Sequence, residues 1–184
     1  MEILLDTLRR KTSQLHQGLH GHPVLKSCQE GTLSKSEYVH LLKAFYSPWK
    51  LLGPMIDQVP ITPLRPKLHS RFQAIKNDLL QLGVNDSTFR SLKPNTKLNK
   101  DQLLGICYVL IGSSMGGTML SEKIRESLGD VPISYMAMTP KEAGWPELVA
   151  KLRTFETKDY AGAPVAAHDA FELVGKELTI KRPG

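Results

Sequence analysis

Apolar residues recur at steps of three and four positions along most of the chain. This spacing places side chains on one face of an α-helix, and it predicts helices over 3–19, 38–52, 68–82, 102–128, 145–155 and 164–178. No segment alternates between apolar and polar residues as a half-buried strand does. The pattern therefore predicts an all-α protein, built as an irregular helical bundle.

Glycine, proline and capping residues predict where these helices begin and end. Gly21 and Pro23 should end the first helix, because proline restricts the residue before it and glycine accepts a left-handed cap. Ser34 and Glu37 have the spacing of a capping box, and Pro48 predicts a kink in the helix that follows. Two segments without a helical stripe are expected to be a linker and a loop, 60–66 and 85–94.

The predicted helix over 102–128, with Asn99 or Asp101 as its cap, contains glycines in its interior: Gly112, Gly116 and Gly117. Each glycine inside a helix costs about 1 kcal/mol relative to alanine, so another effect must offset the loss. Either a second helix packs closely against the bare backbone, or the backbone approaches a flat ligand directly. The residues alone leave both explanations open.

Length and composition predict one domain over residues 1–184. The chain is 41% hydrophobic and 23% charged, as is usual for a globular protein that folds by itself. Cys28 and Cys107 lack the spacing of a disulfide scaffold or a zinc site, and the first residues are acidic where a secretory signal is basic. The longest apolar stretch, 103–112, is shorter than the roughly 20 residues that span a bilayer. We therefore expect a cytoplasmic protein outside the membrane, with reduced cysteines.

The chain carries a formal net charge of +6 and a pI near 9.3, which favours an acidic partner. Its longest basic run is Arg9-Arg10-Lys11, and no nucleic-acid recognition motif accompanies that run. We therefore do not expect nucleic-acid binding, and we assign most of the charge to solvated surface.

One flank of the first predicted helix carries residues that could act on a ligand. His16 lies at the edge of the leucine stripe, and rotation of about 100° per residue places Arg9 and His20 within about 40° of it. A histidine at an apolar boundary suits axial ligation of heme iron, and a cation two turns away could meet a propionate. Helical geometry alone favours the simpler interpretation, a partly buried, hydrogen-bonded histidine beside a surface arginine.

Two segments resemble the heme oxygenase family. Residues 8–19, Leu-Arg-Arg-Lys-Thr-Ser-Gln-Leu-His-Gln-Gly-Leu, followed by His22-Pro23-Val24-Leu25, resemble its first helix, whose histidine is the proximal iron ligand; here that residue is His16. Residues 108–117, Tyr-Val-Leu-Ile-Gly-Ser-Ser-Met-Gly-Gly, resemble its distal helix, whose glycines let the backbone lie over the heme and leave room for oxygen. Looser similarity extends over nearly the whole chain.

The resemblance implies further roles for residues near the heme. Arg9 and Tyr108 occupy positions that hold a heme propionate in the family, and Lys151 or Arg153 could hold the other. The residues expected beside bound oxygen, and counted as catalytic, are Gly112, Ser113 and Gly116, with Gly117 also against the heme. Tyr108, Gly112 and Gly116 are four apart, so they share one helical face.

The chain departs from the family pattern at two positions. His20 stands where the family usually has a glutamate, four residues after the proximal histidine, and this change could alter the electronics of the iron. Ser113 stands where mammalian-type members have an aspartate that organises water. A hydroxyl can also order water, and a small polar residue at this position is similar to bacterial members.

The resemblance implies an enzyme that converts heme, both cofactor and substrate, to biliverdin, carbon monoxide and ferrous iron with O2. The electrons would come from a ferredoxin or a flavin reductase, because a basic surface favours an acidic donor. The bilin could pass to an acceptor such as a phytochrome. The main alternative is a non-catalytic heme or bilin binding protein of the same fold.

Two short motifs suggest other metal sites. Glu37 and His40 have the Glu-x-x-His spacing of a di-iron bundle, but the sequence has no second copy. His16 and His20 could bind zinc, yet no glutamate follows His16 as the hydrolase motif requires.

Overall fold

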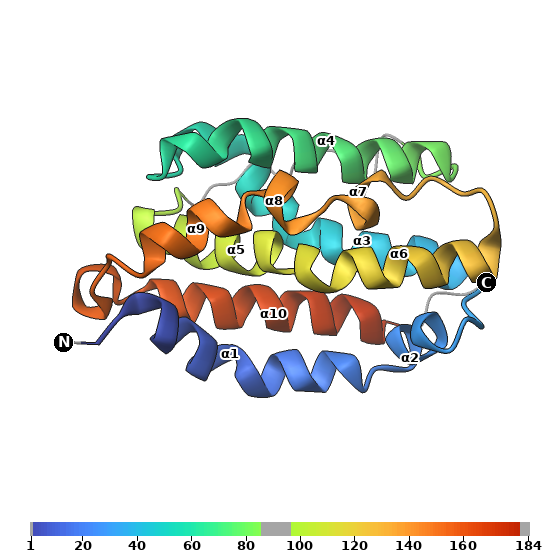
Figure 1. Ribbon diagram of the computed structural model, residues 1–184, viewed down its shortest axis with the longest axis horizontal. Coiled ribbons are helices and arrows are strands. Elements are labelled where there is room, and N and C mark those ends of the chain that lie inside the picture. Colours follow the sequence, from blue (N-terminus) through green and yellow to red (C-terminus); the bar gives the residue numbers. More distant parts are fainter. Residues whose placement is uncertain (1, 86–96, 181–184) are drawn as a thin grey trace.

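The computed structural model describes residues 2–85 and 97–180 of the chain (Figure 1). Most of the loop predicted over 85–94 lies outside these described residues. The long helices run roughly along one axis of the molecule, with α4 at one edge and α1 at the other. They are α1 (Leu4–His20), α3 (Lys35–Leu52), α4 (Arg65–Gln81), α5 (Lys100–Gly112), α6 (Ser114–Leu128) and α10 (Ala163–Thr179).

Short elements join the long helices. The short α-helices are α2 (Pro23–Gln29), α7 (Ser134–Ala137), α8 (Pro140–Ala143) and α9 (Trp145–Leu152). The 3-10 helices are η1 (Gly53–Gln58), η2 (Thr62–Leu64) and η4 (Thr157–Tyr160). Over 2–85 and 97–180 no strand forms, and Ile3 and Glu156 make an isolated antiparallel bridge. The predicted all-α class is confirmed.

Two predicted caps have the expected geometry. The Glu37 N–H donates to Ser34 Oγ at 3.2 Å, and the Ser34 N–H donates to Glu37 Oε2 at 2.7 Å, which completes the capping box of α3. Asn99 caps α5, since its Oδ1 accepts from the N–H groups of Asp101 and Gln102, both at 3.0 Å. Pro48 lies inside α3 without ending it.

Two prolines lie at helix starts that the sequence pattern did not predict. Pro23 opens α2, a helix that was not predicted, and Pro66 lies in the first turn of α4, which begins at Arg65, ahead of the start predicted at 68. A proline fits at the start of a helix because the N–H that it lacks has no intrahelical partner there. The side chain of His22 caps α2 by accepting a hydrogen bond from the Val24 N–H at 3.3 Å. The helix predicted over 145–155 ends at Leu152, and the loop before it contains α7 and α8.

The helix predicted over 102–128 is divided at Ser113 into α5 and α6. The Ser113 N–H donates to Val109 O at 3.0 Å and the Gly117 N–H donates to Ser113 O at 3.1 Å, so backbone hydrogen bonds continue across the junction. By length and composition the run Lys100–Leu128 could cross a membrane, but 56% of its most apolar window is buried inside the protein. Such burial is typical of the core helix of a soluble protein.

Helix α10 packs against both α1 and α5 and lies between them (Figure 1). Gly105 allows the close approach of α5, because a Cβ there would lie 2.3 Å from Ala163 O and 2.8 Å from Ala166 Cβ. Small residues on α10 complete this contact, among them Ala167 and Ala170, both buried. The packing fixes α1, α10 and the α5–α6 run relative to one another, and the candidate site lies among them.

Candidate functional site

A cavity of about 470 Å³ opens among α1, the α5–α6 run, α9 and α10. This volume falls within the range of small-molecule sites, and the lining is mostly apolar. Its lining residues include Arg9, Thr12, His16 and His20 of α1, Tyr108, Gly112, Ser113, Met115, Gly116 and Met119 of the α5–α6 run, Trp145 of α9, and Phe171 and Val174 of α10. The cavity therefore collects residues that are up to 165 positions apart only because the helices pack as they do.

His16 offers an imidazole to this cavity. Its ring lies edge-on to the ring of His20, with 4.7 Å between the ring centroids, and edge-on to Phe171 at 6.1 Å. Burial against these neighbours, followed by the charge on His20, lowers the pKa of His16 below its ordinary value of 6.5. The neutral imidazole, whose ring nitrogen can bind a metal, is therefore favoured near neutral pH.

The interior glycines of the α5–α6 run have different surroundings. A Cβ on Gly116 would meet no heavy atom within 4 Å, so its bare backbone faces open space in the cavity wall. A Cβ on Gly112 would lie 3.3 Å from the Trp145 ring. Gly117 faces the protein instead, because its Cβ would lie 2.8 Å from Met136 O. Close packing therefore explains Gly117, whereas the backbone of Gly116 is left uncovered on the cavity wall.

Arg9, Thr12 and Tyr108 gather at one part of the cavity wall. Burial raises the pKa of Tyr108, while a hydrogen bond with Thr12 and the positive charge of Arg9 lower it. The Tyr108 ring also lies 5.8 Å from the Trp145 ring, measured between centroids. A guanidinium and a phenol at the edge of an apolar cavity can hold the carboxylate of a ligand whose body lies inside.

Lys151 and Arg153 do not join this group. Both side chains are exposed, Lys151 in the last turn of α9 and Arg153 as its C-cap, and neither is among the residues that line the cavity. Of the residues predicted for the site, the structure brings together His16, Arg9, Tyr108, Gly112, Ser113 and Gly116. Gly117, Lys151 and Arg153 lie outside the cavity wall.

Ser113 is held by a buried arginine that the sequence reasoning missed. Arg71 Nη2 of α4 donates to Ser113 Oγ at 2.9 Å, and the Ser113 hydroxyl donates to Leu110 O at 2.8 Å. Ser113 Oγ also lies 3.4 Å from the Tyr135 hydroxyl. A signal was present, because Arg71 and Asp78 interrupt the apolar stripe of α4 at helical spacing, where a polar side chain must be buried.

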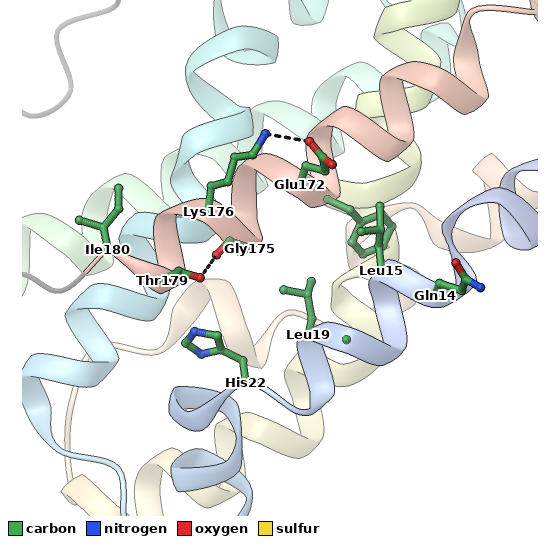
Figure 2. A pocket seen from close by; sticks show the side chains of 11 residues that line it. Gln14, Leu15, Leu19, His22, Glu172, Gly175, Lys176, Thr179 and Ile180 are labelled. Atoms are coloured by element: carbon green, nitrogen blue, oxygen red, sulfur yellow. Dashed lines mark hydrogen bonds and ion pairs between the residues drawn. The ribbon is translucent and has the colours of Figure 1, made fainter.

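A second groove, of about 580 Å³, lies along the other side of α1 and the end of α10 (Figure 2). Leu19 and Phe171 line both hollows and so form the wall between them. Two hydrogen bonds join groups within the groove: Lys176 Nζ donates to Glu172 Oε2, and Thr179 Oγ1 donates to Gly175 O, both at 2.8 Å (Figure 2). None of the residues predicted for the site lines this groove.

Neither alternative metal motif assembles a site in the part of the chain that the structure describes. No group of three or more His, Cys, Asp or Glu side chains could hold a metal ion there. Glu37 is used in the α3 capping box, and His40 Nε2 bonds to Leu178 O at 2.9 Å. His16 is therefore not part of a multi-residue metal site in the described part of the chain.

Two solved structures resemble this chain over nearly its whole length. The heme oxygenase of Leptospira interrogans superposes with a TM-score of 0.75 at 18% sequence identity, covering 96% of this chain and 98% of that chain. Heme oxygenase-1 from the cyanobacterium Synechocystis, in complex with heme, gives a TM-score of 0.70 at 15% identity over 95% of this chain and 90% of that one. No known protein family and no curated protein matches the sequence. The chain thus has the heme oxygenase fold.

Proposed function

We propose that this chain is a heme oxygenase, which opens heme with O2 and external electrons to give biliverdin, carbon monoxide and ferrous iron. The observation that carries the proposal is a single cavity with the imidazole of His16 in one wall and the uncovered backbone of Gly116 in another. A flat macrocycle needs a ligand for its metal on one face and a wall without side chains on the other, and these two residues would supply them.

Heme fits the chemistry of the lining residues. Its porphyrin is large and apolar, like most of the cavity surface, and its propionates are anionic. Arg9 and Tyr108 would hold one propionate at the edge of the cavity, where a charge-assisted hydrogen bond forms while the carboxylate stays partly solvated. For the second propionate we keep the exposed Lys151 and Arg153 as candidates that a bound ligand would have to draw toward the cavity.

The residues of the chain would bind, orient and shield the substrate. His16, favoured in its neutral form, would hold the iron, and Gly112 and Gly116 would leave room for O2 beside it. Ser113 donates its hydroxyl proton to Leu110 O and accepts from Arg71, so it would order the water that delivers protons as an acceptor, through its remaining lone pair. The rings of Trp145 and Phe171 would exclude bulk water from the cavity. Heme itself, once bound, supplies the iron at which O2 is reduced.

The electron donor that we propose is an acidic protein, either a ferredoxin or a flavin reductase. Arg10 and Lys11 are exposed on α1 next to Arg9 in the sequence, and Arg10 is paired with Glu2, so the positive charge that this part of α1 offers a donor comes mainly from Arg9 and Lys11. Complementary charge accelerates such encounters, and salt weakens them. We also propose that biliverdin is released to a bilin acceptor, with a phytochrome as one example.

The second candidate function is a non-catalytic heme or bilin carrier. The observation that favours it is His20, whose ring lies 4.7 Å from that of His16. A carboxylate beside His16 would give its ring N–H a negatively charged partner, and the imidazole of His20 does not. The partner of a metal-bound histidine influences the reactivity of the metal.

Turnover of the heme complex separates the two functions. The purified protein is loaded with ferric heme and supplied with ascorbate or with a reductase system, in the presence of catalase to remove free peroxide. An oxygenase loses its Soret band, forms a green bilin and releases carbon monoxide. A carrier keeps its Soret band and releases no carbon monoxide, which would contradict the proposed activity while leaving heme binding intact.

A further inference from the structure

Arg71 is a buried cation without a carboxylate partner. Its side chain is 1% exposed, and none of the ion pairs among the described residues includes it. All three of its hydrogen bonds go to neutral oxygens: Leu110 O at 3.1 Å, Tyr135 O at 3.2 Å and Ser113 Oγ at 2.9 Å. Its Cζ also lies 4.1 Å from the centroid of the Tyr135 ring. Nothing bonded to Arg71 cancels its charge.

The buried acid of the same helix does not neutralise Arg71. Asp78 lies two turns further along α4, and its carboxylate accepts the N–H groups of Ser134 at 3.1 Å and Tyr135 at 2.7 Å. Burial raises the pKa of Asp78, and the two backbone N–H groups oppose this shift. Asp78 therefore bonds to the backbone of the 134–135 segment, and no ion pair joins it to Arg71 among the described residues.

The charge of Arg71 reaches the cavity through Ser113. Ser113 lines the cavity and Arg71 does not, so the serine hydroxyl stands between the cation and any ligand. An arginine that donates to Ser113 Oγ polarises the O–H bond and fixes the side chain in one rotamer. Burying a charge costs free energy that hydrogen bonds only partly offset, and an apolar residue would fill this position without that cost.

We propose that Arg71 is a positioning residue that clamps Ser113 and gives this wall of the cavity a fixed positive charge, so that a small anionic ligand beside it is favoured. The ligand class is a negatively charged or strongly polarised diatomic or triatomic species bound opposite His16. This inference rests on the proposed function only because heme would carry the ligand; the clamp itself belongs to the heme-free protein.

The clamp is tested first without heme. In the folded, heme-free protein, the Nη protons of Arg71 should give resolved, slowly exchanging NMR signals, because the guanidinium is buried and bonded to three acceptors. Ser113→Ala removes one acceptor and leaves the other two, so the fold should persist while the Nη signals shift and exchange faster. If the Nη signals of Arg71 are averaged in the wild type, the guanidinium is not clamped. If Ser113→Ala leaves these signals unchanged, Ser113 does not hold it; both results are independent of heme binding.

The charge is tested with azide and carbon monoxide on the heme complex. Arg71→Met should lower azide affinity for ferric heme by about tenfold, as expected for the loss of a nearby unit charge in a partly buried site. It should also raise the stretching frequency of bound carbon monoxide, because a positive neighbour favours back-donation into that ligand. Arg71→Lys should recover part of both changes, because it restores the charge without the three-acceptor geometry.

Arg65→Met is the matched control, since Arg65 lies on the same helix and donates from Nε to Val59 O at 2.9 Å, away from the cavity. It should leave azide affinity and the carbon monoxide frequency unchanged. Equal azide affinity in wild type and Arg71→Met, with heme bound in both, would show that Arg71 only supports the fold. If Arg71→Met does not fold, Ser113→Ala provides the same measurement with a smaller expected loss. If neither the wild type nor any variant binds heme, the proposed function is contradicted. The NMR measurement on the heme-free protein then decides whether Arg71 clamps Ser113.

Discussion

Gly105 and Gly116 lie in the same helical run, yet their surroundings are opposite. An added Cβ at Gly105 would come within 2.3 Å of the main chain of α10, whereas one at Gly116 would meet nothing within 4 Å. The first glycine is needed because another helix occupies the space, and the second leaves its space empty on the cavity wall. The comparison shows that a helical glycine marks close packing in one place and a ligand surface in another, and only the neighbouring elements distinguish the two.

The largest expected effect comes from substituting alanine at both positions. Gly105→Ala should destabilise the protein by about 1–3 kcal/mol, because the clash involves backbone that cannot move without shifting α10. Gly116→Ala should raise stability by up to about 1 kcal/mol, because alanine is the better helix former and the space is open. Urea denaturation of the two variants measures both values. If both substitutions changed the free energy of unfolding in the same direction, the two glycines would not have opposite roles.

A larger side chain at Gly116 separates the effect of this position on stability from its effect on heme binding. Gly116→Leu should fold with nearly wild-type stability but bind heme at least about tenfold more weakly, because the side chain fills the space where the macrocycle would lie. Heme titration followed at the Soret band measures the affinity. Met119→Leu is the control, since it keeps an apolar side chain of similar size on the same cavity wall. Undiminished heme affinity in Gly116→Leu would place the ligand elsewhere.

Gly112 should give an intermediate result. Its added Cβ would lie 3.3 Å from the edge of the Trp145 ring, which is a side chain and can shift slightly. We expect Gly112→Ala to change stability by less than about 1 kcal/mol, because the gain in helix propensity and the crowding oppose each other. Trp145→Phe should relieve the crowding, so the double variant should be more stable than the sum of the two single changes. A strictly additive double-mutant cycle would show that the two residues do not interact.

The smallest expected effect is on pH dependence. Burial lowers the pKa of His16 from 6.5, so the folded state binds this proton less readily than the unfolded state. The stability that the neutral side chain contributes is therefore fully present above pH 6.5 and is lost as the pH falls through the lowered pKa. Heme binding should weaken over the same range, because a protonated imidazole cannot bind iron. Comparison of wild type with His16→Gln isolates this contribution, and parallel pH profiles would contradict it.

The sequence predicted much of this fold because apolar periodicity reports directly on burial. Local rules predicted the long helices, the capping box at Ser34 and the cap at Asn99, and tertiary contacts did not override them. Helix α2 was missed because Pro23 was interpreted as a stop, although proline is equally suited to the first turn of a helix. The division at Ser113 was missed because the backbone hydrogen bonds continue across it.

The candidate site was predictable only in part. The flank of α1 that carries Arg9 and His16 follows from helical rotation, and the resemblance supplied Tyr108 and the glycines on the other wall. Arg71 could not be assigned to the site from its own segment, because its partners Leu110, Ser113 and Tyr135 come from other elements. Pairings between distant segments depend on how the helices pack, which periodicity does not specify.

The proposal that His16 binds the heme iron is tested most directly by the axial-ligand spectrum of the heme complex in wild type, His16→Ala and His20→Ala. We expect a histidine-ligated spectrum in wild type and in His20→Ala, and its loss in His16→Ala, with recovery on addition of free imidazole. If His16→Ala keeps the wild-type axial histidine spectrum and turnover, His16 does not hold the iron and the proposed arrangement of the heme is wrong.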